Sequence, residues 1–181
     1  SSKALSIRNY FFETLKFACL IGIKYVSIPL MDEMSLEKDY IRREIELFFR
    51  ETIDKFNLTI LIESDMASKD ILSFIRKFPS KQVGVLYDTG NATRKNLSFK
   101  DDFPLISDAV KEIHFKDYSF SLQKSVRLGH GDTDFAEIYK TLKACKWDGP
   151  IVLETPIFNN WEIEAKNNLN FSQISLERFY R

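Results

Sequence analysis

Apolar residues recur at helical spacing in several separate stretches of the chain. In the stretch 35–56, for example, Ile41, Ile45 and Phe48 fall on one face of a helix. The predicted helices cover 6–20, 35–56, 69–77, 104–109, 135–145 and the chain after Asn160. Gly22 follows the first of them and is typical of a helix C-terminus. The pattern therefore predicts amphipathic helices spread along the whole chain.

Short apolar runs separate these helices and predict buried strands. The runs cover 23–30, 58–63, 82–88, 110–115, 125–128 and 150–154. Strands that alternate with helices and are largely apolar favour a parallel sheet covered by helices. No G-x-G-x-x-G segment follows the first strand, which disfavours the dinucleotide-binding form of an open sheet.

The ends of the predicted strands recur at a nearly constant spacing. The intervals are 25 residues from Glu63 to Asp88, 26 from Asp88 to His114 and 26 from Leu128 to Glu154. Units of that length favour a TIM-type parallel (β/α) barrel. Six strands are two short of a closed barrel, and 181 residues are fewer than the about 250 of a typical one. We expect 1–181 to form a single domain, a partial (β/α)8 barrel of about six strands that lacks the first two βα units.

Ligand-type side chains stand at the ends of four predicted strands. They are Glu63, Asp88, His114 and Glu154. Each alone has an ordinary explanation: a turn accounts for Asp88, and a core histidine accounts for His114. In a parallel barrel, however, the carboxyl ends of the strands meet at one mouth. Three carboxylates and one imidazole there make a mostly oxygen-ligand site, which suits Mn²⁺ or Mg²⁺ better than structural zinc.

Five segments together resemble the xylose isomerase-like TIM barrel superfamily, specifically its sugar-phosphate isomerases and ketose 3-epimerases. They read LIESD, VGVLYDTGNA, VKEIHFKD, RLGHGDTDF and WDGPIVLET, and the similarity covers about 22–155. The resemblance implies that one divalent metal ion is bound by Glu63, Asp88, His114 and Glu154. Mn²⁺ is the favoured ion, with Mg²⁺, Co²⁺ or Zn²⁺ as alternatives.

The same resemblance implies an isomerase or epimerase whose small-molecule partner is a sugar or a sugar phosphate. Removal of a proton next to a carbonyl gives an enediolate, whose negative charge a metal ion stabilises. Glu63 and Glu154 would flank the reacting carbon as catalytic residues. One carboxylate would remove the proton and the other would return it, and the substrate's configuration decides which does which.

Several positions depart from the pattern of that family. Asn91 stands where many relatives have histidine, and Phe120 stands where many epimerases have arginine. The residues expected to contact substrate are Asn91, Lys116, Arg127 and His130. Each also fits an ordinary role, as a turn cap, a surface charge or a solvated loop residue. The same holds for three loop cations that are candidates to meet a phosphate, namely Arg94, Lys95 and Lys124.

The composition narrows the alternatives. Twenty-six basic residues balance 26 acidic ones, which gives no electrostatic reason to expect a nucleic-acid partner. Two histidines are too few for the three-zinc site of an apurinic endonuclease, so that activity is disfavoured. A related dehydratase or an aldose–ketose isomerase would use nearly the same residues. The alternative from a different class is a catalytically inactive truncated barrel that serves as a binding or assembly module.

Two further features concern the setting of the protein. Cys19 and Cys145 lie far apart and belong to no C-x-x-C pair, which favours a reducing, cytoplasmic location. The longest near-apolar stretch is interrupted by Gly22 and Lys24 and no signal peptide precedes it, so a membrane partner is not expected. Exposed apolar faces on an opened sheet would favour a partner chain or a homo-oligomer.

Overall fold

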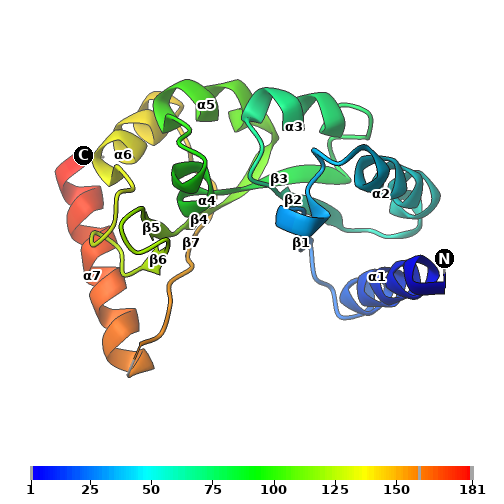
Figure 1. The fold of residues 1–181 in the computed structure, drawn as a ribbon, viewed down its shortest axis with the longest axis horizontal. Helices are drawn as coiled ribbons and strands as arrows, with labels where there is room; N and C mark the ends of the chain where they lie inside the picture. The colour runs from blue at the N-terminus through cyan, green and yellow to red at the C-terminus, as the bar shows by residue number, and fades with distance from the viewer. Residues whose placement is uncertain (1, 159, 180–181) are drawn as a thin grey trace.

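The computed structural model describes residues 2–158 and 160–179 and builds them around a parallel sheet (Figure 1). Among these residues the sheet has five strands, in the order β1-β2-β3-β4-β7. They are β1 (Tyr25–Pro29), β2 (Thr59–Glu63), β3 (Val83–Asp88), β4 (Val110–Phe115) and β7 (Ile151–Leu153). Every neighbouring pair runs parallel, which confirms the predicted TIM-type fold in the form of a truncated barrel.

The predicted strand at 125–128 does not join this sheet, so the prediction of a sixth barrel strand is wrong. Its first residues belong instead to β6 (Lys124–Val126), which pairs antiparallel with β5 (Asp117–Ser119) in a separate hairpin. The buried carboxylate of Asp117 accepts three backbone N–H groups from 129–133 and folds this loop back onto the hairpin. Because this hairpin stays outside the main sheet, no strand lies between β4 and β7, and the two pair directly.

Helices form where the apolar pattern predicted them. They are α1 (Ser2–Leu20), α2 (Asp39–Thr52), α3 (Ser68–Ile75), α5 (Phe99–Ile106), α6 (Phe135–Ala144) and α7 (Trp161–Phe179). Several boundaries differ from the prediction, most of all those of α2 and α5. Short 3-10 helices, η1 (Asp32–Met34) and η2 (Ile53–Lys55), flank a shorter α2. The helix α5 begins at Phe99, ahead of Pro104, which lies inside it.

A short helix that the sequence pattern did not predict follows β3 directly. Arg94 was expected to lie in a loop, whereas the structure places it at the end of α4 (Thr89–Arg94). The helix forms because the side chain of Asp88 caps it, with Asp88 Oδ1 accepting the Asn91 N–H at 2.7 Å. Another 3-10 turn, η3 (Ser107–Ala109), leads from α5 into β4.

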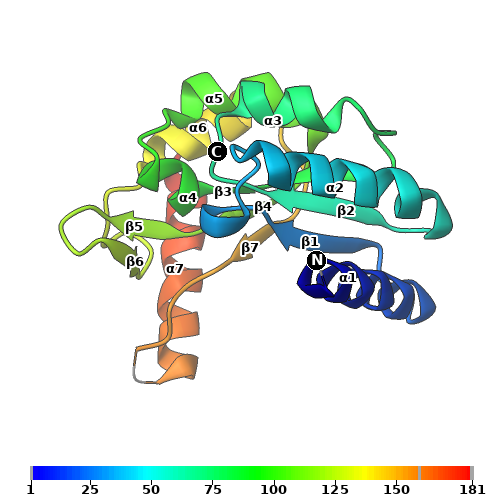
Figure 2. The ribbon, with the colours of Figure 1, turned by 45° about the vertical axis from the view of Figure 1, so that its right-hand side comes forward.

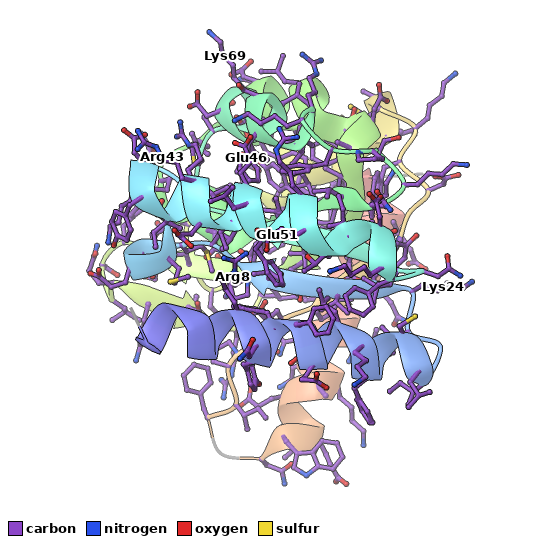
Figure 3. All side chains as sticks on the ribbon, turned by 90° about the vertical axis from the view of Figure 1, so that its right-hand side faces the viewer. Arg8, Lys24, Arg43, Glu46, Glu51 and Lys69 are labelled. Atoms are coloured by element: carbon purple, nitrogen blue, oxygen red, sulfur yellow. The ribbon has the colours of Figure 1, made fainter. Side chains whose placement is uncertain are left out.

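The helices lie along one side of the sheet and at its two ends. Figure 1 shows α2, α3, α5 and α6 following one another, with α1 at one end of the row and α7 at the other. Figure 2 shows the β5–β6 hairpin projecting beside α4. At the β1 end, α1 and α2 lie alongside each other, and an ion pair joins Arg8 to Glu51 between them (Figure 3).

The core lies between the sheet and this row of helices, and aromatic rings fill much of it. Phe49, Phe103, Phe115 and Tyr139 are the largest fully buried side chains. Phe49 meets Phe78 edge to face, with ring centroids 5.3 Å apart. Burial of one such ring stabilises the fold by about 1.5–3 kcal/mol. This packing fixes the strands against the helices and so sets where the strand ends lie.

The two outer strands of the sheet each have a strand neighbour on one side only, since β1 and β7 stand at its edges. Apolar side chains near both edges are exposed. They include Ile23, Tyr25, Ile151, Val152 and Trp161. Within the described part of the chain, these exposed residues are the feature for which a partner chain or a homo-oligomer was considered, and such a partner stays a prediction.

Two findings bear on the setting. Cys19 and Cys145 are both free thiols and both partly buried. In the described part of the chain, no helix combines the length and the apolar character needed to cross a membrane.

Candidate metal centre and active site

Three of the four predicted ligands come together at the carboxyl edge of the sheet. Asp88 is the last residue of β3, His114 lies near the end of β4, and Glu154 directly follows β7. Asp88 and His114 are paired in register, and His114 is paired with Val152 on its other side. One ligand atom from each of Asp88, His114 and Glu154 lies within 4.8 Å of the others. Parallel pairing in register thus places the three side chains together.

The donor set of this cluster fits a divalent metal ion. Carboxylate oxygen and imidazole nitrogen are the ligand types that Mn²⁺, Zn²⁺ and similar ions share. His114 Nδ1 lies 2.7 Å from Glu154 Oε2, and His114 Nε2 lies 3.1 Å from Glu112 Oε1. In many metal sites one ring nitrogen of a histidine binds the ion and the other donates to a carboxylate, a role that Glu112 can fill here. Asp88, His114 and Glu154 therefore form a possible metal site.

Asp88 carries out two tasks with its two oxygens. Its side chain is buried, and Oδ1 caps α4 through the Asn91 N–H. Oδ2 faces the cluster, where Lys116 Nζ lies 3.3 Å away. The turn-forming role and the ligand role are therefore compatible in one residue, because each uses a different oxygen.

Glu63 lies beside the cluster and is held by an amide. It ends β2 and is 8% exposed, and Oε1 accepts a hydrogen bond from Asn91 Nδ2 at 2.8 Å. The Asn91 amide also lies 3.1 Å from the sulfur of Met31. Glu63 is not one of the three residues whose ligand atoms gather within 4.8 Å. Its predicted roles as a ligand and as an acid or base stay predictions.

The carboxylates of the site have pKa values that are displaced in opposite directions. Burial raises the pKa of Glu63, and the negative charges of Asp88 and Glu154 raise it further. Hydrogen bonds from His114 and Lys116 lower the pKa of Glu154 to about 2, against the opposing effect of its partial burial. Burial also raises the pKa of Asp88, although Lys116 opposes this. Glu63 and Glu154 thus sit in different electrostatic environments, as acid and base partners often do.

Two cationic groups face these carboxylates. Burial alone would lower the pKa of His114, but its hydrogen bonds with Glu154 and Glu112 outweigh burial and raise it. For Lys116, burial likewise opposes the charge, whereas Asp88 and Glu154 raise the pKa overall. The Lys116 ammonium lies 2.5 Å from Glu154 Oε1, so a lysine charge stands next to a member of the candidate metal site. Sequence reasoning assigned Lys116 to substrate and did not predict this position.

A sequence signal for these neighbours does exist. Glu112, His114 and Lys116 alternate along β4 and just beyond it. Alternate residues of a strand project from the same face of the sheet, so all three side chains reach the site. Sequence reasoning used His114 alone and missed Glu112.

The other predicted substrate contacts lie around this site in different ways. Asn91 is buried in it, as described above. Arg127 pairs with Glu164, a buried residue of α7, with Nε donating to Oε2 at 2.5 Å, and its guanidinium lies 5.3 Å from the ring centroid of Phe158. His130 is exposed in the loop after the β5–β6 hairpin. Substrate contact by these residues stays a prediction.

Two of the three cations that were candidates to meet a phosphate are paired with carboxylates. Arg94 and Lys95 both contact Asp65 Oδ2, at 3.2 and 3.1 Å, and the side chain of Asp65 is only 2% exposed. Arg94 also pairs with Asp32 at 3.2 Å. Lys124, at the start of β6, is exposed. This arrangement ties α4 to the segments that follow β1 and β2.

The fold and the place of the cluster define a class of protein, a parallel (β/α) barrel with a metal-type site at the carboxyl ends of its strands. A family model described as xylose isomerase-like TIM barrel matches residues 9–174. The chain belongs to this family. A search of the curated proteins finds no match.

Solved structures with the same fold include several members of this superfamily. A xylose isomerase domain protein from Planctomyces limnophilus has a TM-score of 0.76 and 16% identity, over 97% of this chain and 67% of that one. D-psicose 3-epimerase from Clostridium cellulolyticum H10, solved with D-tagatose, has a TM-score of 0.71 and 14% identity, over 93% and 70%. The IolI protein with a bound zinc atom has a TM-score of 0.72 and 14% identity, over 99% and 71%. At these identities the likeness concerns the fold.

Proposed function

We propose that this chain carries the site of a divalent-metal-dependent sugar or sugar-phosphate epimerase or isomerase, with Mn²⁺ as its ion. One observation carries the proposal: Asp88, His114 and Glu154 meet within 4.8 Å at the carboxyl edge of a truncated barrel, with the buried Glu63 beside them. Family membership and the epimerases among the structures of the same fold support the choice of reaction class.

In this proposal Asp88, His114 and Glu154 hold the ion, and Glu63 completes the ligand set. The bound ion would supply positive charge beside the substrate oxygens on which negative charge develops. Glu63 and Glu154 come from β2 and from the end of β7, strands that stand on either side of β3 and β4. They can therefore address the reacting carbon from two sides, one removing a proton and the other returning it.

The surrounding polar groups would bind and orient the sugar. Asn91 holds Glu63 through its amide and can offer its remaining hydrogen-bonding capacity to a hydroxyl. Lys116 would contact a substrate oxygen near Glu154. Arg127 and His130 would contact the substrate from the loop that follows β6. We also propose a cytoplasmic location, which the two free thiols favour.

The first test is Mn²⁺ binding, measured by titration calorimetry. We expect the wild-type chain to bind one ion and the Asp88→Ala, His114→Ala double variant to bind at least about 100-fold more weakly, because two ligands are gone. Asp148→Ala, an exposed acid outside the cluster, is the matched control and should bind like the wild type. A wild-type chain that binds no Mn²⁺ contradicts the proposed function.

The second step of the test follows the proton. With Mn²⁺ in deuterated buffer, we expect the chain to exchange the hydrogen next to the carbonyl of one sugar in a panel of ketoses and ketose phosphates, followed by NMR. Glu63→Gln should slow that exchange by about 10²–10⁴-fold, because an amide cannot transfer the proton. Loss of water from the sugar, in place of simple exchange, would identify a dehydratase that uses the same residues.

The second candidate function is a binding or assembly module without catalysis. It is favoured by the two open edges of the sheet and the exposed apolar residues near them. Binding of Mn²⁺ without hydrogen exchange on any sugar of the panel would support this alternative, and a homo-oligomer would then be the first assembly to look for.

A further inference from the structure

The ammonium group of Lys116 lies where a divalent ion would have to bind. Lys116 Nζ is 3.3 Å from Asp88 Oδ2 and 2.5 Å from Glu154 Oε1. These carboxylates belong to two of the three residues whose ligand atoms gather within 4.8 Å. The lysine side chain is only 17% exposed, so its charge is held inside the site and not in bulk water.

The fold holds this lysine in place at its backbone. Thr89 Oγ1 donates to the Lys116 carbonyl at 2.7 Å and accepts the Lys116 N–H at 3.0 Å. Thr89 is itself buried and is the first residue of α4. The start of the helix that Asp88 caps is therefore tied to the backbone of Lys116.

The stem of the lysine crosses a glycine, which gives it room to reach the carboxylates. A Cβ atom added at Gly90 would lie 2.7 Å from Lys116 Cγ and 2.9 Å from Cδ, which is too close for either to stay. Any larger residue at position 90 would push the stem, and with it the ammonium, out of its place. Gly90 thus positions Lys116 without touching the cluster.

Charge balance explains why a cation is needed there. Glu63, Asp88 and Glu154 bring three carboxylates to one partly buried site, and like charges in such a site repel strongly. An ammonium and a divalent ion that contact the same carboxylates repel each other for the same reason. They cannot both occupy the space between Asp88 and Glu154.

We propose that Lys116 is a built-in counter-ion of this site that competes with the divalent ion for Asp88 and Glu154 and is displaced from them when the ion binds. This inference rests on the proposed function, because it presupposes that the cluster binds a metal. Once displaced, the ammonium is free to contact a substrate oxygen, which links the competition to the expected role of Lys116 in substrate binding. Metal affinity is thereby kept lower than the ligands alone would give.

The test is Mn²⁺ calorimetry on Lys116→Met, which keeps the stem and removes the charge. We expect Mn²⁺ to bind between about 5-fold and 150-fold more tightly than to the wild type, the usual range for coupled sites. Lys111→Met is the matched control, because Lys111 also crosses a glycine, Gly84, but donates to the Asp108 carbonyl away from the cluster. Lys111→Met should leave the affinity unchanged.

A second variant covers the case in which Lys116→Met fails to fold. Gly90→Ala keeps all charges and displaces the lysine stem, so it should also tighten Mn²⁺ binding. A thermal melt of each variant in chelator and in Mn²⁺ gives an independent reading. The rise in Tm caused by Mn²⁺ should be larger for Lys116→Met than for the wild type, because the metal-free form has lost its counter-ion.

The outcomes distinguish the counter-ion role of Lys116 from the metal site itself. Equal or weaker Mn²⁺ binding by folded Lys116→Met, with binding by the wild type intact, overturns the counter-ion role and leaves the metal site standing. Binding by Lys116→Met alone would show that the cluster can hold the ion but that Lys116 is not displaced by it in the wild-type chain, which contradicts the displacement and the proposed function of that chain. Absence of binding by the wild type and by all variants overturns the metal site and the counter-ion role together.

Discussion

Buried carboxylates are the residues that organise this chain, and each is held by a different kind of partner. Asp88 caps a helix with one oxygen and faces a lysine with the other. Asp102 accepts hydrogen bonds from the side chains of Ser68 and Tyr87. Asp117 accepts hydrogen bonds from backbone N–H groups. Because a buried carboxylate without partners is costly, every partner in these sets carries stabilisation.

Asp117 offers a prediction at the scale of one residue. It is fully buried, and its oxygens accept N–H groups from Gly129 and Gly131 at 2.9 Å and from Thr133 at 3.2 Å. In Asp117→Asn an amide NH₂ must face a backbone donor, so we expect the free energy of unfolding to fall by about 1.5–3 kcal/mol in urea titrations.

The control for this variant is Asp148→Asn, an exposed acid, which should stay within about 0.5 kcal/mol of the wild type. If Asp117→Asn is as stable as the control, the carboxylate does not organise the loop that presents His130.

At the scale of an element, the start of α3 depends on another helix. Its N-cap residue, Ala67, has no side chain that can accept a hydrogen bond. Asp102, from α5, accepts the Ser68 N–H at 2.9 Å and the Ser68 hydroxyl at 2.6 Å, and it also accepts the Tyr87 hydroxyl at 2.9 Å. One carboxylate therefore joins α3, α5 and β3, and its negative charge lies at a helix N-terminus.

We expect Asp102→Ala to lower the free energy of unfolding by about 2–3 kcal/mol, because it leaves buried donors on Ser68 and Tyr87 without acceptors. The measurement is chemical denaturation followed by circular dichroism. The neighbouring Asp101→Ala, which removes an exposed acid, should change stability by no more than about 0.5 kcal/mol. Equal effects of the two variants would contradict the role of Asp102.

At the scale of the whole molecule, the sheet is strongest in its middle. β2 and β3 are buried and have strand neighbours on both sides, whereas β1 and β7 have one neighbour each. Glu154 follows the edge strand β7, while Asp88 is the last residue of the central strand β3. The candidate metal site therefore combines a residue of a strand that has two strand neighbours with a residue beside a strand that has only one.

Amide hydrogen exchange measured by mass spectrometry should reflect this difference. We expect peptides of β2 and β3 to be the best protected, and peptides of β7 to exchange considerably faster, because local opening needs fewer broken contacts at an edge. Helix α2, packed on the core through Phe48 and Phe49, serves as an internal reference of high protection. Equal protection of β3 and β7 would show that the edge is covered in solution.

Much of this fold could be predicted from the sequence, and the misses have identifiable causes. The strands of the sheet follow from apolar runs, since buried parallel strands are apolar throughout. The short helix α4 was missed because 89–94 has no apolar periodicity, and its signal is the cap at Asp88. The strand expected at 125–128 has an apolar residue pattern, but the hydrogen bonds of Asp117 draw the chain that follows it into a loop.

The candidate site was predicted in part for similar reasons. Asp88, His114 and Glu154 could be found because strand ends recur at regular spacing, and parallel register then brings them together. Lys116 was assigned to substrate because Phe120 stands where many epimerases have arginine, and its contacts with Asp88 and Glu154 were missed because they join residues 28 and 38 positions apart. Arg127 was expected to contact substrate, and its pairing with Glu164 was not predicted because Glu164 lies 37 residues away on a helix whose docking no local pattern reveals.

The sequence by itself determined the long helices, the strands of the sheet, its parallel class and the identity of the ligand-type residues at the strand ends. These follow from periodicity and from the residue at which each apolar run stops, which are local properties of the chain. Only the tertiary structure decided that β7 pairs with β4, that Asp102 caps a helix other than its own, and that Lys116 stands between Asp88 and Glu154. Such partners are distant along the chain, and packing and charge choose them only when the whole sheet has formed.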